Sequence, residues 1–141
     1  MLAPVALDPA RVLLPLALER VPAGFPSPAA DYLDDSIDLT DELVRHPAAT
    51  FLMRVAGDSM LDAGIHSGDL LVIDRSLPAT VGTVVIAALD GAFTVKQLQR
   101  LPDGRLALCA ANDAYAPIVP EGDMELTCWG VVTYVIHRPR C

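Results

Sequence analysis

One serine and one lysine stand out as a candidate catalytic pair. Ser59 lies in the segment Gly57-Asp58-Ser59-Met60, just after a predicted strand, where the glycine permits a tight turn. Lys96 is the sole lysine, and the other nine of the ten Lys and Arg residues are arginines. Arginine cannot lose its proton near neutral pH and lysine can, so a single retained lysine favours a general base. A serine beside a lysine base would cleave acyl bonds by nucleophilic attack.

Each of the two residues also has an ordinary interpretation. Gly-Asp-Ser is a common turn composition, and a lysine in a strand most often faces solvent. The segment is not the GxSxG turn of α/β-hydrolases, because Leu61 stands where the second glycine would be. A Ser-His-Asp triad is poorly supported, although His66 follows seven residues after Ser59. The two residue types alone therefore leave the choice open.

The cysteines and histidines show no sequence pattern of a metal site. Three widely spaced cysteines lack CxxC spacing: Cys109, Cys128 and Cys141. Three histidines form no HxxxH or Cys/His motif: His46, His66 and His137. We therefore predict no metal and no cofactor, and a reducing compartment that leaves the thiols free.

Charge and length exclude several classes of protein. The chain has 141 residues, a net charge of −8 and a pI near 4.6. This length suits one compact domain. Because the negative charge opposes binding to a phosphate backbone, we predict no direct binding to duplex DNA and favour protein partners. The apolar run Leu126–His137 is shorter than the roughly 20 residues of a spanning helix, so we predict no membrane segment.

Hydrophobic patterns predict a mostly antiparallel β domain that would position Ser59 and Lys96. Stretches rich in Val, Ile and Thr predict strands over residues 51–56, 69–74, 83–89, 93–99, 106–110 and 124–137. Asp90-Gly91 predicts a two-residue hairpin turn. The one predicted helix runs from Leu39 to His46, with Asp38 as its cap and Pro47 as its stop. Before it, four prolines within residues 1–23 indicate an arm, followed by an extended strip over about residues 21–28.

Four segments, in matching order, resemble the LexA/UmuD family of Ser-Lys self-cleaving proteins. They are Gly24-Phe25-Pro26-Ser27-Pro28-Ala29-Ala30-Asp31-Tyr32, Gly57-Asp58-Ser59-Met60, Gly68-Asp69-Leu70-Leu71 and Asp90-Gly91-Ala92-Phe93-Thr94-Val95-Lys96. The resemblance covers about residues 21–136 and extends to residues 112–118 and 130–132. It implies the mostly β fold of the family's carboxyl-terminal peptidase domain, with one short helix and an extended N-terminal arm.

The resemblance also implies a reaction, which is self-cleavage between Ala23 and Gly24. Ser59 would attack the carbonyl carbon of Ala23, and a neutral Lys96 would take the serine proton and pass it to the amine of Gly24. Backbone N–H groups of Asp58 and Ser59 would hold the oxyanion. For Lys96 to be neutral at pH 7–8, its pKa must fall by roughly 2–3 units from about 10.4, which burial can supply.

The implied roles divide the chain into three parts and assign partners. Residues 1–23 are the arm removed on cleavage, residues 24–48 an extended linker with the short helix, and residues 49–141 the β-rich peptidase core and dimerisation domain. The resemblance implies a cytoplasmic protein of the bacterial SOS response to DNA damage. A RecA–single-stranded-DNA filament would stimulate cleavage, and the shortened homodimer would join a UmuC-type polymerase in error-prone translesion synthesis.

Three alternatives interpret the same residues differently. The chain could be a non-catalytic dimerisation or binding module, although the presence of both Ser59 and Lys96 argues against lost activity. The small residues before Gly24 also fit a signal-peptide cleavage site at Ala23, but no basic residue precedes Arg11. The chain could also be a LexA repressor, but such a repressor is expected to carry a DNA-binding domain longer than the 23 residues before the bond. The sequence leaves open whether cleavage occurs within or between subunits, and what Cys141 does.

Overall fold

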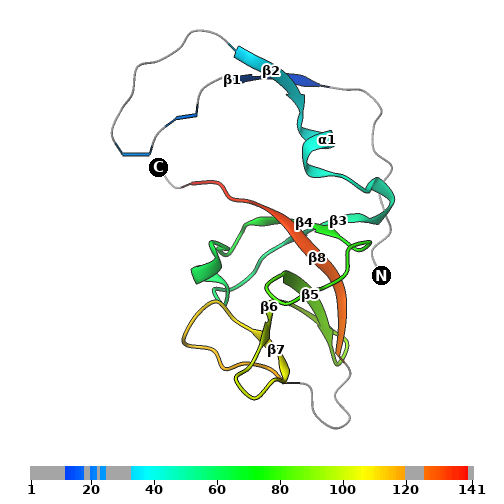
Figure 1. Cartoon of the computed structure of the whole chain (residues 1–141), viewed down its shortest axis with the longest axis vertical. Coiled ribbons are helices and arrows are strands. Elements are labelled where there is room, and N and C mark those ends of the chain that lie inside the picture. The colour runs from blue at the N-terminus through cyan, green and yellow to red at the C-terminus, as the bar shows by residue number, and fades with distance from the viewer. Residues whose placement is uncertain (1–11, 18–19, 22, 25–32, 120–125, 140–141) are drawn as a thin grey trace. The chain divides into compact units, whose positions relative to one another are not determined.

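The described part of the chain forms two compact units. The computed structural model describes residues 12–17, 20–21, 23–24, 33–119 and 126–139 (Figure 1). One unit ends at Arg45 and the other begins at His46. Most of the predicted extended strip over residues 21–28, and Cys141, lie outside the described residues. Within the described residues, no helix is both long enough and apolar enough to cross a membrane.

The first unit contains a two-stranded sheet and the one α-helix found in the described residues. Strand β1, Leu13–Ala17, pairs antiparallel with β2, Leu33–Asp38. Neither strand was predicted, because Pro15 in β1 and the acidic residues of β2 are disfavoured in strands. All five residues of β1 are exposed, so this strand shows none of the hydrophobic alternation that a sequence pattern detects.

Helix α1, Leu39–Leu43, begins as predicted and ends earlier than predicted. The side chain of Asp38 accepts hydrogen bonds from the backbone N–H groups of Thr40 and Asp41, which confirms the predicted cap. The predicted end at His46 was wrong, because Val44 already has extended backbone angles. His46, which precedes a proline, is also outside helical geometry, as the ring of a following proline requires.

The second unit is built on a six-stranded antiparallel sheet with the order β3-β4-β8-β5-β6-β7 (Figure 1). Its strands are β3 Thr50–Arg54, β4 Leu70–Asp74, β5 Val84–Leu89, β6 Ala92–Arg100, β7 Leu106–Cys109 and β8 Leu126–Ile136. All six match predicted strands within a few residues. Asp90 and Gly91 both have positive φ between β5 and β6, which confirms the predicted hairpin. Two 3₁₀ turns, Pro47–Ala49 and Leu61–Ala63, flank β3 and its following loop.

Strand β8 lies in the middle of the sheet and is bent by two irregularities. Its pairing shifts by one residue against β4, beside Val132, and again against β5, beside Gly130. Such bulges bend a strand and increase its twist. The ring of Trp129 consequently contacts Phe51 of β3 and Phe93 of β6, with centroids 5.0 and 5.3 Å apart. Side chains from β3 and β6, which lie on opposite sides of β8 in the sheet, therefore pack against the ring of Trp129.

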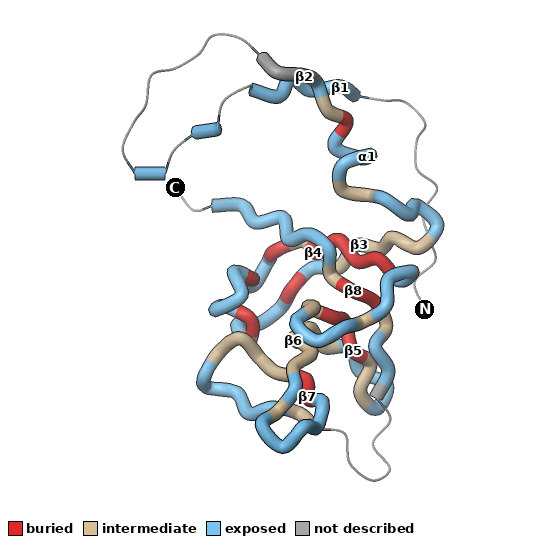
Figure 2. The backbone as a smooth tube through the Cα atoms, in the orientation of Figure 1, coloured by how far each residue is buried: buried red, intermediate tan, exposed pale blue. Residues whose placement is uncertain are grey.

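The hydrophobic core of the second unit anchors the loop that carries Ser59. Figure 2 shows buried stretches in β4 and β5, where four of five and three of six residues are buried. One buried cluster comprises Val55, Met60, Ile65, Leu71, Ile73 and Ile86, and a second comprises Val85, Ala87, Leu108 and Val131. Met60, directly after Ser59, is almost fully buried. The buried side chain of Met60 thus anchors Ser59 to the hydrophobic core.

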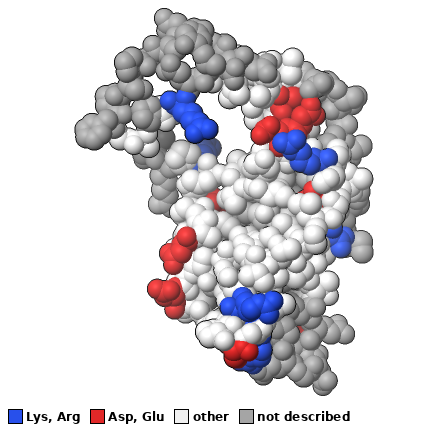
Figure 3. All heavy atoms as spheres, in the orientation of Figure 1, with Lys and Arg blue, Asp and Glu red and all other residues white. Residues whose placement is uncertain are grey.

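Charged side chains are scattered over the face of the molecule that Figure 3 shows. In the face shown in Figure 3, the described Lys, Arg, Asp and Glu side chains form small separate groups, and no continuous basic strip is visible among them. The preference for protein partners over duplex DNA stays a prediction from the net charge of −8.

Candidate active site

Ser59 lies on a loop that the neighbouring turn holds from one side. The loop leaves β3 at Val55, which exchanges backbone hydrogen bonds with the turn at residues 68–69. The backbone N–H of Gly57 donates to Oγ of Ser67 over 3.3 Å. Gly57 has φ +98°, a left-handed conformation that other residues rarely adopt. The glycine of the motif is therefore needed for the chain reversal that presents Ser59.

A second segment holds the same loop at the residue before the serine. The side-chain amide of Asn112 donates to the backbone oxygen of Asp58 over 2.9 Å. The hydroxyl of Tyr115 donates to the carboxylate of Asp58 over 2.7 Å. This hydrogen bond and the negative charge of Asp58 raise the pKa of Tyr115, so the phenol stays a donor. Asp58 is fixed at both its backbone and its side chain.

Lys96 reaches the serine from β6, 37 residues further along the chain. Its Nζ lies 3.0 Å from Oγ of Ser59, which is hydrogen-bonding distance. The residue is only 8% exposed, and this burial lowers the pKa of Lys96. The ammonium nitrogen also lies 5.4 Å from the centre of the Tyr115 ring. The predicted pair is thus brought together inside one unit.

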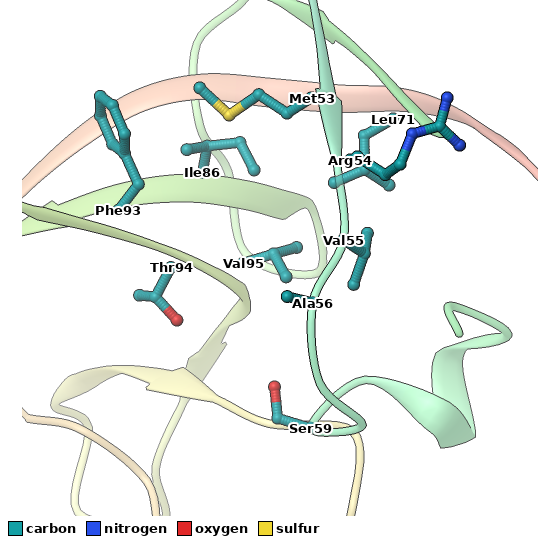
Figure 4. A pocket seen from close by; sticks show the side chains of 10 residues that line it. All are labelled: Met53, Arg54, Val55, Ala56, Ser59, Leu71, Ile86, Phe93, Thr94 and Val95. Atoms are coloured by element: carbon teal, nitrogen blue, oxygen red, sulfur yellow. The ribbon is translucent and has the colours of Figure 1, made fainter. Parts of the chain in front are cut away.

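A pocket of about 240 Å³ opens beside the serine (Figure 4). Most of its walls are apolar side chains from β3, the loop after it and β6, and it is lined by Met53, Arg54, Val55, Ala56, Ser59, Leu71, Ile86, Phe93, Thr94 and Val95. Figure 4 shows Ser59 at one end of the pocket and Met53 and Phe93 at the other. The apolar side chains of this lining can contact apolar groups of a substrate that lies next to the serine hydroxyl.

The geometry permits one kind of chemistry in particular. A neutral amine 3.0 Å from a hydroxyl can remove its proton, since general bases work at about 2.6–3.2 Å. The surrounding apolar residues favour the neutral amine over the ammonium. The site can therefore generate a serine nucleophile without a histidine.

The predicted site residues fall into two groups in the structure. Asp58, Ser59 and Lys96 come together in the second unit. Ala23 and Gly24 belong to the first unit, where both are exposed and Gly24 has φ +118°. The approach of this bond to Ser59 and the oxyanion role of Asp58 and Ser59 stay predictions.

Sequence reasoning missed the supports of the site. Asn112 and Tyr115 lie in the segment 112–118 that resembles the family, but nothing local to that segment shows that it contacts Asp58. A tyrosine and an asparagine in a loop are common, and their partner lies more than 50 residues away in sequence. The pairing of strands that are distant in sequence brings Asn112 and Tyr115 to Asp58.

Comparisons with known proteins give the family. A family model described as Peptidase S24-like matches residues 15–133. Protein SamA of Salmonella typhimurium is 50% identical over 133 residues, which cover 94% of this chain and 91% of that protein. Protein MucA of Escherichia coli is 44% identical over 130 residues, which cover 91% of this chain and 88% of that protein.

A repressor matches as well, over a smaller share of its own length. The LexA repressor of Bordetella petrii is 39% identical over 127 residues, which cover 90% of this chain and 55% of that protein. The chain therefore belongs to the Peptidase S24-like family.

Proposed function

We propose that this chain is a serine endopeptidase that cleaves itself between Ala23 and Gly24, with Ser59 as nucleophile and Lys96 as general base. The observation that carries the proposal is the 3.0 Å separation of Nζ and Oγ at a lysine that is 8% exposed. Burial lowers the pKa of Lys96, which is the direction a base needs. Membership of a peptidase family supports the same reaction class.

The reaction would proceed in two stages. Neutral Lys96 takes the proton of the Ser59 hydroxyl while Oγ attacks the carbonyl carbon of Ala23. Backbone N–H groups of Asp58 and Ser59 stabilise the negatively charged oxygen. Lys96 then gives its proton to the nitrogen of Gly24 as that bond breaks, leaving an ester between Ala23 and Ser59. A water molecule, deprotonated by Lys96, hydrolyses the ester and restores the serine.

The arm supplies a suitable substrate. Ala23 and Gly24 are exposed and small, so a backbone can approach the bond closely. Thirty-five residues join Gly24 to Ser59, and at about 3.3 Å each they allow docking within the same chain or on a second copy. This supports dividing the chain into an arm of residues 1–23, a linker of residues 24–48 and a peptidase and dimerisation core of residues 49–141.

The wider role follows from the family resemblance. A RecA–single-stranded-DNA filament stimulates the cleavage in the cytoplasm, and the shortened homodimer then joins a UmuC-type polymerase for error-prone translesion synthesis. The arm carries two acidic and two basic residues, so its loss leaves the charge unchanged and acts by uncovering surface. The net charge of −8 supports protein partners over duplex DNA.

Incubation with activated RecA filament tests this function. Intact-mass measurement should show a new chain that begins at Gly24. Ser59→Ala and Lys96→Arg should stay whole, because the first lacks the nucleophile and the second keeps a cation that cannot become neutral. Both variants should still dimerise. Wild-type chain that stays whole with the filament and at high pH would favour a non-catalytic binding module instead.

Polymerase binding is a separate step with its own measurement. A UmuC-type polymerase should retain the chain that begins at Gly24 more strongly than it retains the uncut Ser59→Ala chain. Equal retention of both forms would show that cleavage does not control assembly, although cleavage itself would stand.

A further inference from the structure

A buried carboxylate at the start of β4 lies between two histidines that are far apart in sequence. Asp69 is only 4% exposed. One carboxylate oxygen lies 2.6 Å from Nδ1 of His137, which follows β8, and the other lies 3.7 Å from Nδ1 of His66. The two imidazole rings face each other with centroids 4.5 Å apart and an interplanar angle of 31°.

The three side chains offer a suitable set of donor atoms for a metal. One donor atom from each residue lies within 4.8 Å of the others. A zinc ion with bonds of about 2.0–2.2 Å requires donors roughly 3–3.5 Å apart, so only small side-chain movements are needed. The histidine side chains are 47% and 39% exposed and can rotate, whereas Asp69 is held in place.

The surroundings of Asp69 orient it as the surroundings of metal ligands usually do. The backbone N–H of His66 donates to the carboxylate over 2.8 Å, which fixes the plane of the group. The exposed side of the histidines leaves room for water in the remaining coordination positions. Two imidazole nitrogens and one carboxylate oxygen suit zinc, nickel or copper better than magnesium or calcium, which prefer oxygen ligands.

We propose that His66, Asp69 and His137 form a binding site for a divalent transition-metal ion such as Zn²⁺. The ion would connect the turn before β4 to the end of β8. In the same turn, the backbone N–H of Gly68 donates to the backbone oxygen of Val55. Oγ of Ser67 accepts from the backbone N–H of Gly57. The metal would therefore stabilise the turn that supports the serine loop.

The chain provides a matched control at the other end of β4. Asp74 is equally buried and bonds an exposed histidine, His46. Its other hydrogen bonds come from Ser76, and no second histidine lies with it among the described residues. His46→Asn therefore removes a histidine–aspartate pair of the same kind without removing a ligand of the proposed site.

Calorimetric titration of the full-length chain with Zn²⁺, and with Co²⁺ followed by absorption, tests the site. We expect one saturable ion per chain, a rise in the thermal unfolding temperature with Zn²⁺, and no binding of Mg²⁺. His66→Asn and His137→Asn should each weaken binding by at least about tenfold, whereas His46→Asn should leave it unchanged. Circular dichroism without metal checks that each variant folds.

Several results would overturn the proposal. One is the absence of saturable Zn²⁺ binding up to millimolar concentration. Another is equal binding by wild type, His66→Asn and His137→Asn. A third is a loss of binding in Cys128→Ser alone, because that exposed thiol would then be the ligand. If Asp69→Asn does not fold, the two histidine variants still decide the outcome.

Discussion

Different interactions stabilise the interior of each of the two compact units. Among the described side chains of the first unit, only Asp38 is buried, and every residue of β1 is exposed. The second unit buries two hydrophobic clusters, and four of the five residues of β4 are buried. In the described residues, the first unit therefore relies mainly on backbone pairing, whereas the second is stabilised by packing as well.

This difference matches the tasks that we assign to the units. A cleavable bond must become available to an active site, and a weakly packed region can open at small free-energy cost. A nucleophile and its base must keep their separation constant to within a few tenths of an ångström, which a packed sheet can maintain. Substitutions in the second unit should therefore change stability strongly, whereas those in the first should change it little.

The largest expected effect comes from removing the amine of Lys96. Lys96→Met should slow self-cleavage by about 10³-fold, because general bases contribute 10²–10⁴. Its unfolding free energy should stay equal or rise, since a buried amine is replaced by an apolar chain of similar length. Mass spectrometry and urea denaturation measure the two effects. Cleavage within tenfold of wild type would remove Lys96 from the mechanism.

The next largest effect is expected from overpacking the middle of the sheet. A methyl group on Gly130 would lie 2.6 Å from a side-chain carbon of Ile73. Gly130→Ala should therefore cost about 2 kcal/mol of unfolding free energy, whereas Leu14→Ala on exposed β1 should cost less than about 0.5 kcal/mol. Equal losses in urea denaturation would contradict the contrast between the units.

A smaller effect is expected from acid at the end of β4. Burial raises the pKa of Asp74, but hydrogen bonds from Ser76 and His46 outweigh it and leave the pKa below 3.8. Because the folded pKa lies below the unfolded one, the contribution is present above pH 3.8 and is lost as the pH falls through the folded pKa.

Asp74→Asn provides the comparison for that acid effect. The variant should be about 1–2 kcal/mol less stable than wild type near pH 6, and the difference should shrink below pH 3.8. Denaturation at a series of pH values measures it. A difference that is the same at pH 3 and pH 6 would mean that Asp74 does not act through its charge.

The smallest effect is expected at the support of the serine loop. Tyr115→Phe keeps the ring near Lys96 and removes the hydrogen bond to Asp58. Cleavage should slow by roughly fivefold, about 1 kcal/mol, with its pH dependence unchanged, because the base is intact. An altered pH profile would show instead that Tyr115 acts on Lys96 directly.

Local sequence patterns were enough to predict most of the second unit. Its strands are rich in β-branched residues and bounded by turn residues, and Asp90-Gly91 requires positive φ at both positions, so each element was found from its own residues. The single lysine among arginines drew attention to Lys96, but its pairing with Ser59 was predicted from the family resemblance.

Non-local pairing explains what the sequence could not predict. The position of β8 between β4 and β5 depends on contacts between residues that are dozens of positions apart. The same pairing brings His137 to Asp69 and β6 to the serine loop, so neither the histidine cluster nor the exact site geometry is visible in local spacing. Strands β1 and β2 were missed because backbone bonds, not a hydrophobic face, join them.

The pH dependence of self-cleavage tests the central claim most directly. Purified chain, incubated without filament at increasing pH, is analysed for the product that begins at Gly24. Because burial lowers the pKa of Lys96, the neutral fraction grows with pH below that pKa. The account predicts a rate that rises about tenfold per pH unit and then levels off. A product that forms at a pH-independent rate, or equally fast from Lys96→Met, would contradict it.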